Sequence, residues 1–170
     1  WEVPGEPVSV NEALAATYER TAVGEMFGRP WGTTWFRMAG TVPDEWAGAT
    51  VDASINLGFS FMPGFQSEGL IWAQEDSGEW TPRRGLHPFN HDVSVASSAV
   101  GGEAVSFFIE AASNPPIVVH GPDRNSDLLT ASTDPMYTLS RAELVVVNTD
   151  VVELREDIRA LTGLMNQLAL

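Results

Sequence analysis

The stretch Val51-Asp52-Ala53-Ser54-Ile55-Asn56-Leu57 decides the fold class, because apolar and polar residues alternate along its whole length. A period of two places every second side chain on the same face of an extended strand, whereas a helix needs a period near 3.6. We therefore expect one face of this strand in a core and the other among polar groups.

Neighbouring runs from about residue 33 to residue 121 have the same β character. The run Thr34-Trp35-Phe36-Arg37-Met38 is rich in residues that favour strands. Val105, Phe107 and Ile109 alternate with polar neighbours, although the apolar Phe108 interrupts the pattern. These two runs add strands to the one that residues 51–57 predict.

Shorter strands are predicted at residues 70–72, 92–95 and about 141–147, with a turn at residues 76–79 and a loop-rich region at residues 114–135. Short strands separated by Gly and Pro turns, without helices between them, are typical of an antiparallel sandwich. The sequence thus predicts an all-β domain, an antiparallel β-sandwich of jelly-roll (galactose-binding-like) type.

Two helices are expected, one at each end of the β region. Ser9 and Glu12 have the spacing of a capping box before a short helix. Asp150 and Glu153 resemble a second box, which would start a helix over about residues 151–168. Spacings of three and four place one apolar stripe on that helix, formed by Val151, Leu154, Ile158, Leu161, Met165 and Leu168. We divide the chain into a sandwich, 1–148, and a connecting helix, 149–170.

Composition excludes several classes of partner and site. The net charge is −14 and all nine basic residues are Arg, so nucleic acid and anionic membranes are not expected as partners, whereas a neutral sugar is compatible. The chain has no Cys, which excludes disulfides and thiolate metal sites and is expected of a cytoplasmic protein. The first residues lack the pattern of a signal peptide and an initiator Met, so we expect the chain to belong to a longer reading frame or to be processed.

The sequence contains no nucleophile elbow, no Walker loop and no H-E-x-x-H motif. His87, His91 and Asp92 could form a metal site. Two imidazoles four residues apart would align on a helix, but Pro88 disfavours a helix there. Zinc also usually needs three or four well-placed ligands. We favour a loop in which His and Asn side chains bond backbone groups and fix its shape. We assign no metal ligand, no cofactor and no catalytic residue in this chain.

Carboxylates and tryptophans leave further alternatives. Glu68 and Glu110 lie in or beside apolar strands, where burial would raise a carboxyl pKa, but paired or solvated carboxylates are the favoured interpretation. Trp35 and Trp72 are expected in the core. Trp31, in a loop flanked by Gly and Pro, is the better candidate for a contact surface.

Several stretches in order resemble one family. Gly28-Arg29-Pro30-Trp31-Gly32-Thr33-Thr34-Trp35-Phe36-Arg37 is similar to the opening strand of the N-terminal domain of bacterial and vacuolar α-mannosidases, glycoside hydrolase family thirty-eight. The likeness continues at residues 41–48, 63–70, 85–88 and 102–115, and it covers about residues 8–168. The ordered set of motifs is more specific than any one of them.

The resemblance implies a retaining glycosidase in which an Asp nucleophile forms a mannosyl-enzyme and a zinc ion holds sugar hydroxyls. The family's catalytic barrel begins with an H-x-D motif. Here His87, His91 and His120 are followed two positions later by Phe, Val and Pro. The nucleophile and the zinc ligands are therefore expected in a catalytic domain outside this chain.

From the resemblance we expect a non-catalytic N-terminal accessory domain that packs on the catalytic barrel of the same polypeptide and is inactive alone. Loops 62–69 and 85–92 are the expected docking or substrate-side surface, with the candidate residues Trp31, Gln66, Glu68, His87, Asn90 and His91. The alternative is a carbohydrate-binding module that itself binds sugars such as mannosides, which would require exposed aromatic residues on one face.

The end of the terminal helix has two candidate partners. Its apolar residues Leu161, Met165 and Leu168 could pack on the catalytic barrel. In the chain alone, that half of the helix should either fray or pair with a second copy, which would make a homo-oligomer.

Overall fold

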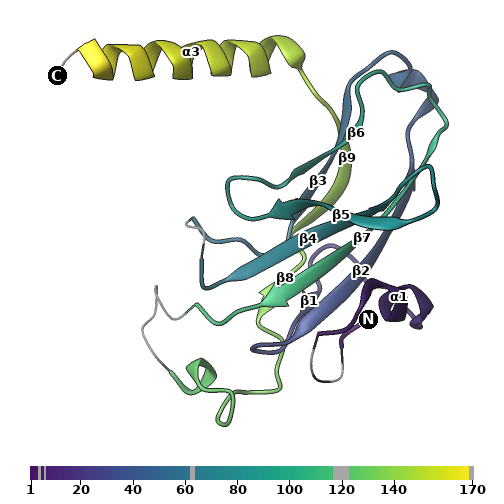
Figure 1. The fold of residues 1–170 in the computed structure, drawn as a ribbon, viewed down its shortest axis with the longest axis vertical. Helices are drawn as coiled ribbons and strands as arrows, with labels where there is room; N and C mark the ends of the chain where they lie inside the picture. Colours follow the sequence, from purple (N-terminus) through teal and green to yellow (C-terminus); the bar gives the residue numbers. More distant parts are fainter. Residues whose placement is uncertain (4, 6, 62–63, 117–122, 169–170) are drawn as a thin grey trace.

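The computed structural model describes residues 1–3, 5, 7–61, 64–116 and 123–168. Two antiparallel sheets form a sandwich, one with strand order β2-β7-β4-β5 and the other with order β6-β3-β9, and β1 pairs with β8 (Figure 1). The strands are β1 (Met26–Phe27), β2 (Thr33–Thr41), β3 (Val51–Asn56), β4 (Ser67–Gln74), β5 (Trp80–Leu86), β6 (Asp92–Ala96), β7 (Ala104–Ser113), β8 (Tyr137–Thr138) and β9 (Arg141–Val146). The helices are α1 (Val10–Ala15), the 3₁₀ turns η1 (Asp44–Trp46) and η2 (Arg124–Ser126), and α3 (Thr149–Leu168). The predicted all-β jelly-roll sandwich with a C-terminal helix is confirmed.

The main core lies between the two sheets. From β3 the alternating residues Val51, Ala53 and Ile55 are all buried, as the period of two predicts. Ala53 and Ile55 share one apolar cluster with Ile71 and Ile109 of the four-stranded sheet. Removing these side chains from water supplies the main force that holds the sheets together.

The four-stranded sheet is also buried on its outer face, which explains why Phe108 breaks the alternation of β7. Phe107 and Ile109 point into the main core, while Phe108 and Trp35 belong to a second buried cluster. Val3 and Ala13, from the N-terminal segment and α1, complete that cluster. A strand that is buried on both faces needs apolar residues at consecutive positions.

The N-terminal segment is bonded along the free edge of β2. The backbone N–H of Val3 donates to Thr33 O at 2.9 Å, and the N–H of Trp35 donates to Trp1 O at 2.8 Å. The predicted capping box of α1 is present, since Ser9 and Glu12 bond each other's backbone N–H groups. The first residues of the chain therefore extend the sheet, and α1 covers its face.

β5 is an edge strand that the sequence did not indicate. It pairs only with β4 in the described sheet, and its register shifts where Ile71 faces Arg84 and Trp72 faces Pro82. Proline is tolerated at such an edge because it removes only an unused donor. Pro82, Arg83 and Arg84 lack the apolar alternation by which the other strands were found.

The start of α3 differs from the prediction. Asn148 Oδ1 accepts a hydrogen bond from the N–H of Val151 at 3.1 Å, so Asn148 caps a helix that begins at Thr149. The expected box of Asp150 and Glu153 is wrong, because both residues already lie inside the helix. α3 projects from the sandwich, and none of its described residues is buried (Figure 1). Among the described helices, none is both long and apolar enough to cross a membrane.

Tyr137 of β8 closes one end of the main core. Its ring is buried beside Phe27, and its hydroxyl donates to the backbone oxygen of Asn114. Burial raises the pKa of the Tyr137 phenol from its ordinary value of 10.0 to about 12, because the phenolate would be poorly solvated there.

We predict that Phe108→Ala lowers the free energy of unfolding by about 3–5 kcal/mol, because it leaves a cavity in the second cluster. Ser106→Ala is the matched control, since Ser106 is exposed on the same face of β7 and should change stability by less than about 0.5 kcal/mol. Urea denaturation measures both values. Equal, small effects of the two substitutions would show that the outer face is not a core.

Alkaline unfolding tests the environment of Tyr137. Below pH 10 the phenol is neutral in both states, but between pH 10.0 and about 12 the unfolded chain loses this proton first, so stability falls as the pH rises. The loss should reach about 2 kcal/mol near the top of this range. With no Lys or Cys in the sequence, Tyr18 is the other side chain that titrates there. The decline should therefore be much shallower in Tyr137→Phe, and an unchanged slope would contradict the assignment.

Candidate functional site

The strand order gathers the candidate residues at one end of the sandwich, which we call the loop end. It comprises, as far as the structure describes them, the loop residues 28–32, 57–61, 64–66, 87–91, 114–116 and 123–136. The strand pairing explains this arrangement. β2 and β4 both begin beside the end of β7. β5 ends beside the start of β4, so the turn that follows β5 lies at the same end. All six residues expected at a docking or substrate-side surface lie in these loops or beside them: Trp31, Gln66, Glu68, His87, Asn90 and His91. Met62 and Pro63 of the expected 62–69 loop lie outside the described residues.

Trp31 is held in a tight turn against the end of β7. Gly28 permits this close approach, because a Cβ there would lie 1.8 Å from Ser113 Oγ and the backbone φ is +70°. Trp31 donates its backbone N–H to Ser113 O at 2.9 Å and its indole Nε1–H to Asn125 O at 2.8 Å. The residue is 39% exposed, so it remains available to a partner.

Gln66 and Glu68 have different surroundings although they are two residues apart. Gln66 is 2% exposed. Its side-chain Oε1 accepts a hydrogen bond from the N–H of Ser60 at 2.7 Å, and its backbone oxygen accepts one from Asn114 Nδ2 at 3.2 Å. Gln66 therefore shapes the loop from within and offers no surface contact. Glu68 is exposed on the face of β4 that points away from the main core.

The segment from His87 to Asn90 forms a tight turn that leads from β5 to β6 and so joins the two sheets. His87 and Asn90 exchange backbone hydrogen bonds of 3.1 and 2.9 Å. His87 Nδ1 accepts from the N–H of Phe89 at 3.2 Å, and Asn90 Nδ2 donates to Gly85 O at 2.6 Å. The Arg84 guanidinium also donates to Asn90 Oδ1. These are the contacts of the shape-fixing loop that the sequence favoured.

The imidazoles do not fit the metal site that His87, His91 and Asp92 could have formed. His87 Nδ1 is already an acceptor, and His91 Nδ1 lies 3.3 Å from Asp92 Oδ1, which also accepts from Ser54 Oγ at 2.8 Å. Within the described ranges, three or more His, Asp or Glu side chains nowhere come together as metal ligands would.

The carboxylates of Glu110 and Asp92 make structural hydrogen bonds. Glu110 Oε2 accepts from Trp72 Nε1 at 3.0 Å, which is the paired state favoured from the sequence. On the three-stranded sheet, burial and then the charge of Asp92 raise the pKa of Asp52, while Arg84 opposes the shift. Asp52 and Asp92 lie on the paired strands β3 and β6, and Asp92 is held by the hydroxyl of Ser54.

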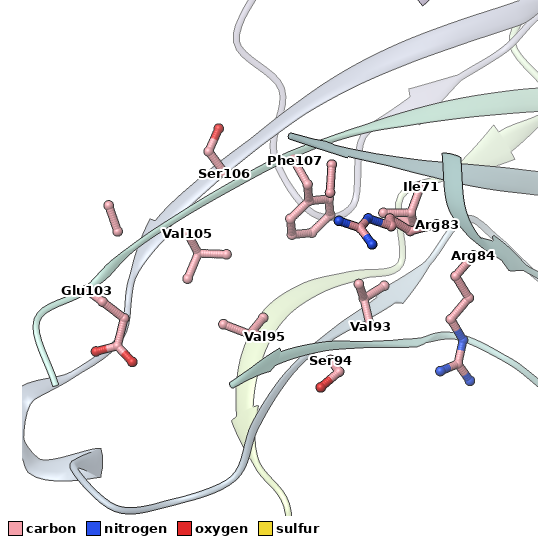
Figure 2. Close-up of a pocket in the computed structure, with 12 residues that line it drawn as sticks. Ile71, Arg83, Arg84, Val93, Ser94, Val95, Glu103, Val105, Ser106 and Phe107 are labelled. Atoms are coloured by element: carbon pink, nitrogen blue, oxygen red, sulfur yellow. The ribbon is translucent and has the colours of Figure 1, made fainter. Parts of the chain in front are cut away.

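A groove of about 500 Å³ opens between the edges of the two sheets, at β5 and β6 (Figure 2). Arg83 and Arg84 lie toward one end and Glu103 at the other (Figure 2). The lining also includes the apolar side chains of Ile71, Val93, Val95, Val105 and Phe107. Arg83 pairs with Glu75 at 2.6 Å. Hydrogen bonds from its own backbone N–H, and from those of Val100 and Gly101, lower the pKa of Glu103. The groove thus holds engaged charges and lacks a free acid and base pair.

The most unusual feature of the loop end is a pair of aromatic residues with left-handed backbone. Trp31 has φ +63° and Phe65 has φ +48°, and they are the two non-glycine residues with positive φ in the described part of the chain. Such a conformation costs a bulky residue about 1–2 kcal/mol and is concentrated at functional sites. Phe65 is 50% exposed, and more apolar side chains are exposed in the same group of loops: Phe61, Phe89, Leu128 and Leu129.

Sequence reasoning named the loop of Phe65 but not Phe65 itself. The available signal was an aromatic residue directly after Pro63-Gly64, where no strand or helix pattern could bury it. A set of exposed apolar residues at one end marks a surface for another protein or a ligand.

Known proteins agree with this architecture. Residues 1–145 match the family described as "Alpha-mannosidase, jelly roll domain". The chain is 29% identical over 167 residues to human alpha-mannosidase 2C1, covering 96% of this chain and 14% of that protein. It is 28% identical over 152 residues to alpha-mannosidase G of Dictyostelium discoideum, covering 88% of this chain and 13% of that protein.

The chain thus spans about one seventh of the length of these relatives. The family match covers both sheets up to residue 145, within β9, and does not include α3. By this match over most of its length, the chain belongs to the α-mannosidase jelly-roll domain family.

Proposed function

We propose that this chain is a non-catalytic N-terminal accessory domain of a family thirty-eight α-mannosidase, which packs through its loop end on the catalytic domain of the same polypeptide. The observation that carries the proposal is the exposed, strained pair Trp31 and Phe65 at that end. Strain persists in a fold when the surrounding structure enforces it, and at a contact surface it holds large side chains in place for a partner.

The absence of a catalytic motif supports the non-catalytic role. No H-x-D motif occurs in the sequence, and Glu75, Glu103 and Glu110 are engaged in hydrogen bonds or ion pairs. Hydrolysis of α-mannosides, with the zinc ion that the family resemblance implies, is proposed for the catalytic domain alone. A cytoplasmic location is inferred from the Cys-free sequence.

A carbohydrate-binding module is not favoured. Tryptophan indoles are strong candidates for stacking on sugar rings, but Trp46 and Trp80 pack against buried clusters, and of Trp31, Trp46 and Trp80 Trp31 alone is exposed. Trp31 and Phe65 are exposed among apolar neighbours, which suits a protein surface better than the many hydroxyl groups of a sugar.

The isolated chain should neither hydrolyse nor bind mannosides. An aryl α-mannoside with added zinc or cobalt should give no product, and methyl α-mannoside should leave the tryptophan fluorescence unchanged. Turnover that survives purification would reject the non-catalytic role. Saturable sugar binding that Trp31→Ala abolishes would establish the binding module instead.

Phe65→Asn separates contact from stability. Asn adopts a left-handed backbone at lower cost than Phe, so the isolated chain should keep or gain stability, by up to about 1 kcal/mol. Binding to the separately expressed catalytic domain of the same enzyme, measured by calorimetry, should weaken at least about tenfold, because a central aromatic contact is lost. Val100→Asn is the control, since Val100 is 81% exposed at the opposite end of the sandwich and should leave binding unchanged. Equal binding by both variants would refute docking through the loop end.

A further inference from the structure

The apolar stripe of α3 has no partner among the described residues. Its six members are between 55% and 79% exposed: Val151, Leu154, Ile158, Leu161, Met165 and Leu168. The helix has 20 residues, which corresponds to about 30 Å of length. A helix of this kind depends for its stability on burying its apolar face, so the stripe requires an occupant.

The spacing of the stripe is that of a coiled coil. Successive members are three, four, three, four and three residues apart, which places Val151, Ile158 and Met165 at heptad position a and the three leucines at position d. A helix that packs on a globular core usually adds a third apolar position in each heptad, at e or g. Here the e positions hold Arg155 and Thr162, and among the g positions Leu164 alone is apolar.

The residue types at these positions favour two parallel strands. β-Branched Val151 and Ile158 at a, with Leu at every d, is the combination that selects a parallel dimer over larger bundles. The flanking charges select the same orientation. In a parallel pair Asp150 at g faces Arg155 at e of the other helix, whereas an antiparallel pair with overlapping stripes would place Arg155 beside Thr162 and Asp157 beside Leu164 and form no such ion pair.

Arg155 is free to pair with Asp150 of the other helix. Within its own helix it lies 3.1 Å from Glu156, and both side chains are more than half exposed. An exposed pair of this kind contributes little to stability and can exchange for a partner across the seam.

We infer that α3 pairs with α3 of a second copy of this chain as a parallel two-stranded coiled coil. This inference goes beyond the proposed function and does not rest on it. The last strand, β9, ends where β3 begins, so α3 leaves the sandwich at the end opposite the loop end (Figure 1). A dimer formed through α3 therefore leaves the loop end of each copy free to dock.

Sedimentation equilibrium of the 170-residue chain over a wide range of concentration tests the pairing. The wild type should show a monomer–dimer equilibrium, and Leu161→Glu should weaken it about a hundredfold or more by placing a charge in the seam. Ala160→Glu is the matched control, because it adds the same charge at an outward position of the same turn. All six Trp residues precede α3, so their fluorescence shows independently that the sandwich is folded in each variant.

A chain that stays monomeric at every concentration would overturn the inference, and the catalytic domain would then be the occupant of the stripe. A dimer that persists in Leu161→Glu would overturn it as well, because the contact would lie elsewhere on the molecule.

Disulfide trapping tests the orientation, which is straightforward because the chain has no Cys. In a parallel pair Val151→Cys should crosslink to itself under mild oxidation, and so should Leu168→Cys, since equivalent positions face each other. Crosslinking that occurs only in a mixture of the two variants would show an antiparallel pair and refute the parallel arrangement.

Discussion

The structure depends on the burial of β7 and its neighbours on both faces. Ile109 closes the core between the sheets, and Phe108 closes the cluster beneath the N-terminal segment. β7 is also bonded on both edges, to β2 and to β4. The order of the loops follows from this central position, because the strands that flank β7 bring residues 28–32, 57–61 and 64–66 to the same end as its own C-terminus.

The sequence predicted those elements whose pattern is set by local burial. The alternation of residues 51–57 identified β3 because one face of the three-stranded sheet is buried and the other is polar. Ser9 and Glu12 identified α1 because a capping box is a contact between near neighbours. β5 was missed because an edge strand with Pro82 buries too little to show a pattern. The two-residue strands β1 and β8 are defined by tertiary pairing alone.

The candidate site was predictable in part. The chosen loops do meet at one end, but that meeting follows from the strand order, which no local pattern contains. The inward turn of Gln66 and the left-handed backbone of Phe65 could not be read from the sequence, because both depend on how distant segments such as Ser60 and Asn114 constrain one loop. Asn148 replaced Asp150 as the cap of α3 because both residue types favour that position and only the exit of β9 decides between them.

The pairing of the N-terminal segment with β2 has a consequence for the solubility of the domain. The first three residues hydrogen-bond the backbone groups at the outer edge of β2. Together with α1 they also cover Trp35 and Phe108. If that segment were displaced by proteolysis, by fusion to another protein or by slow folding, an unpaired strand edge would become exposed beside a large aromatic surface. Such a combination is a template for strand addition by a second molecule. The high negative charge would then be the remaining protection against aggregation, and it would weaken as salt screens it.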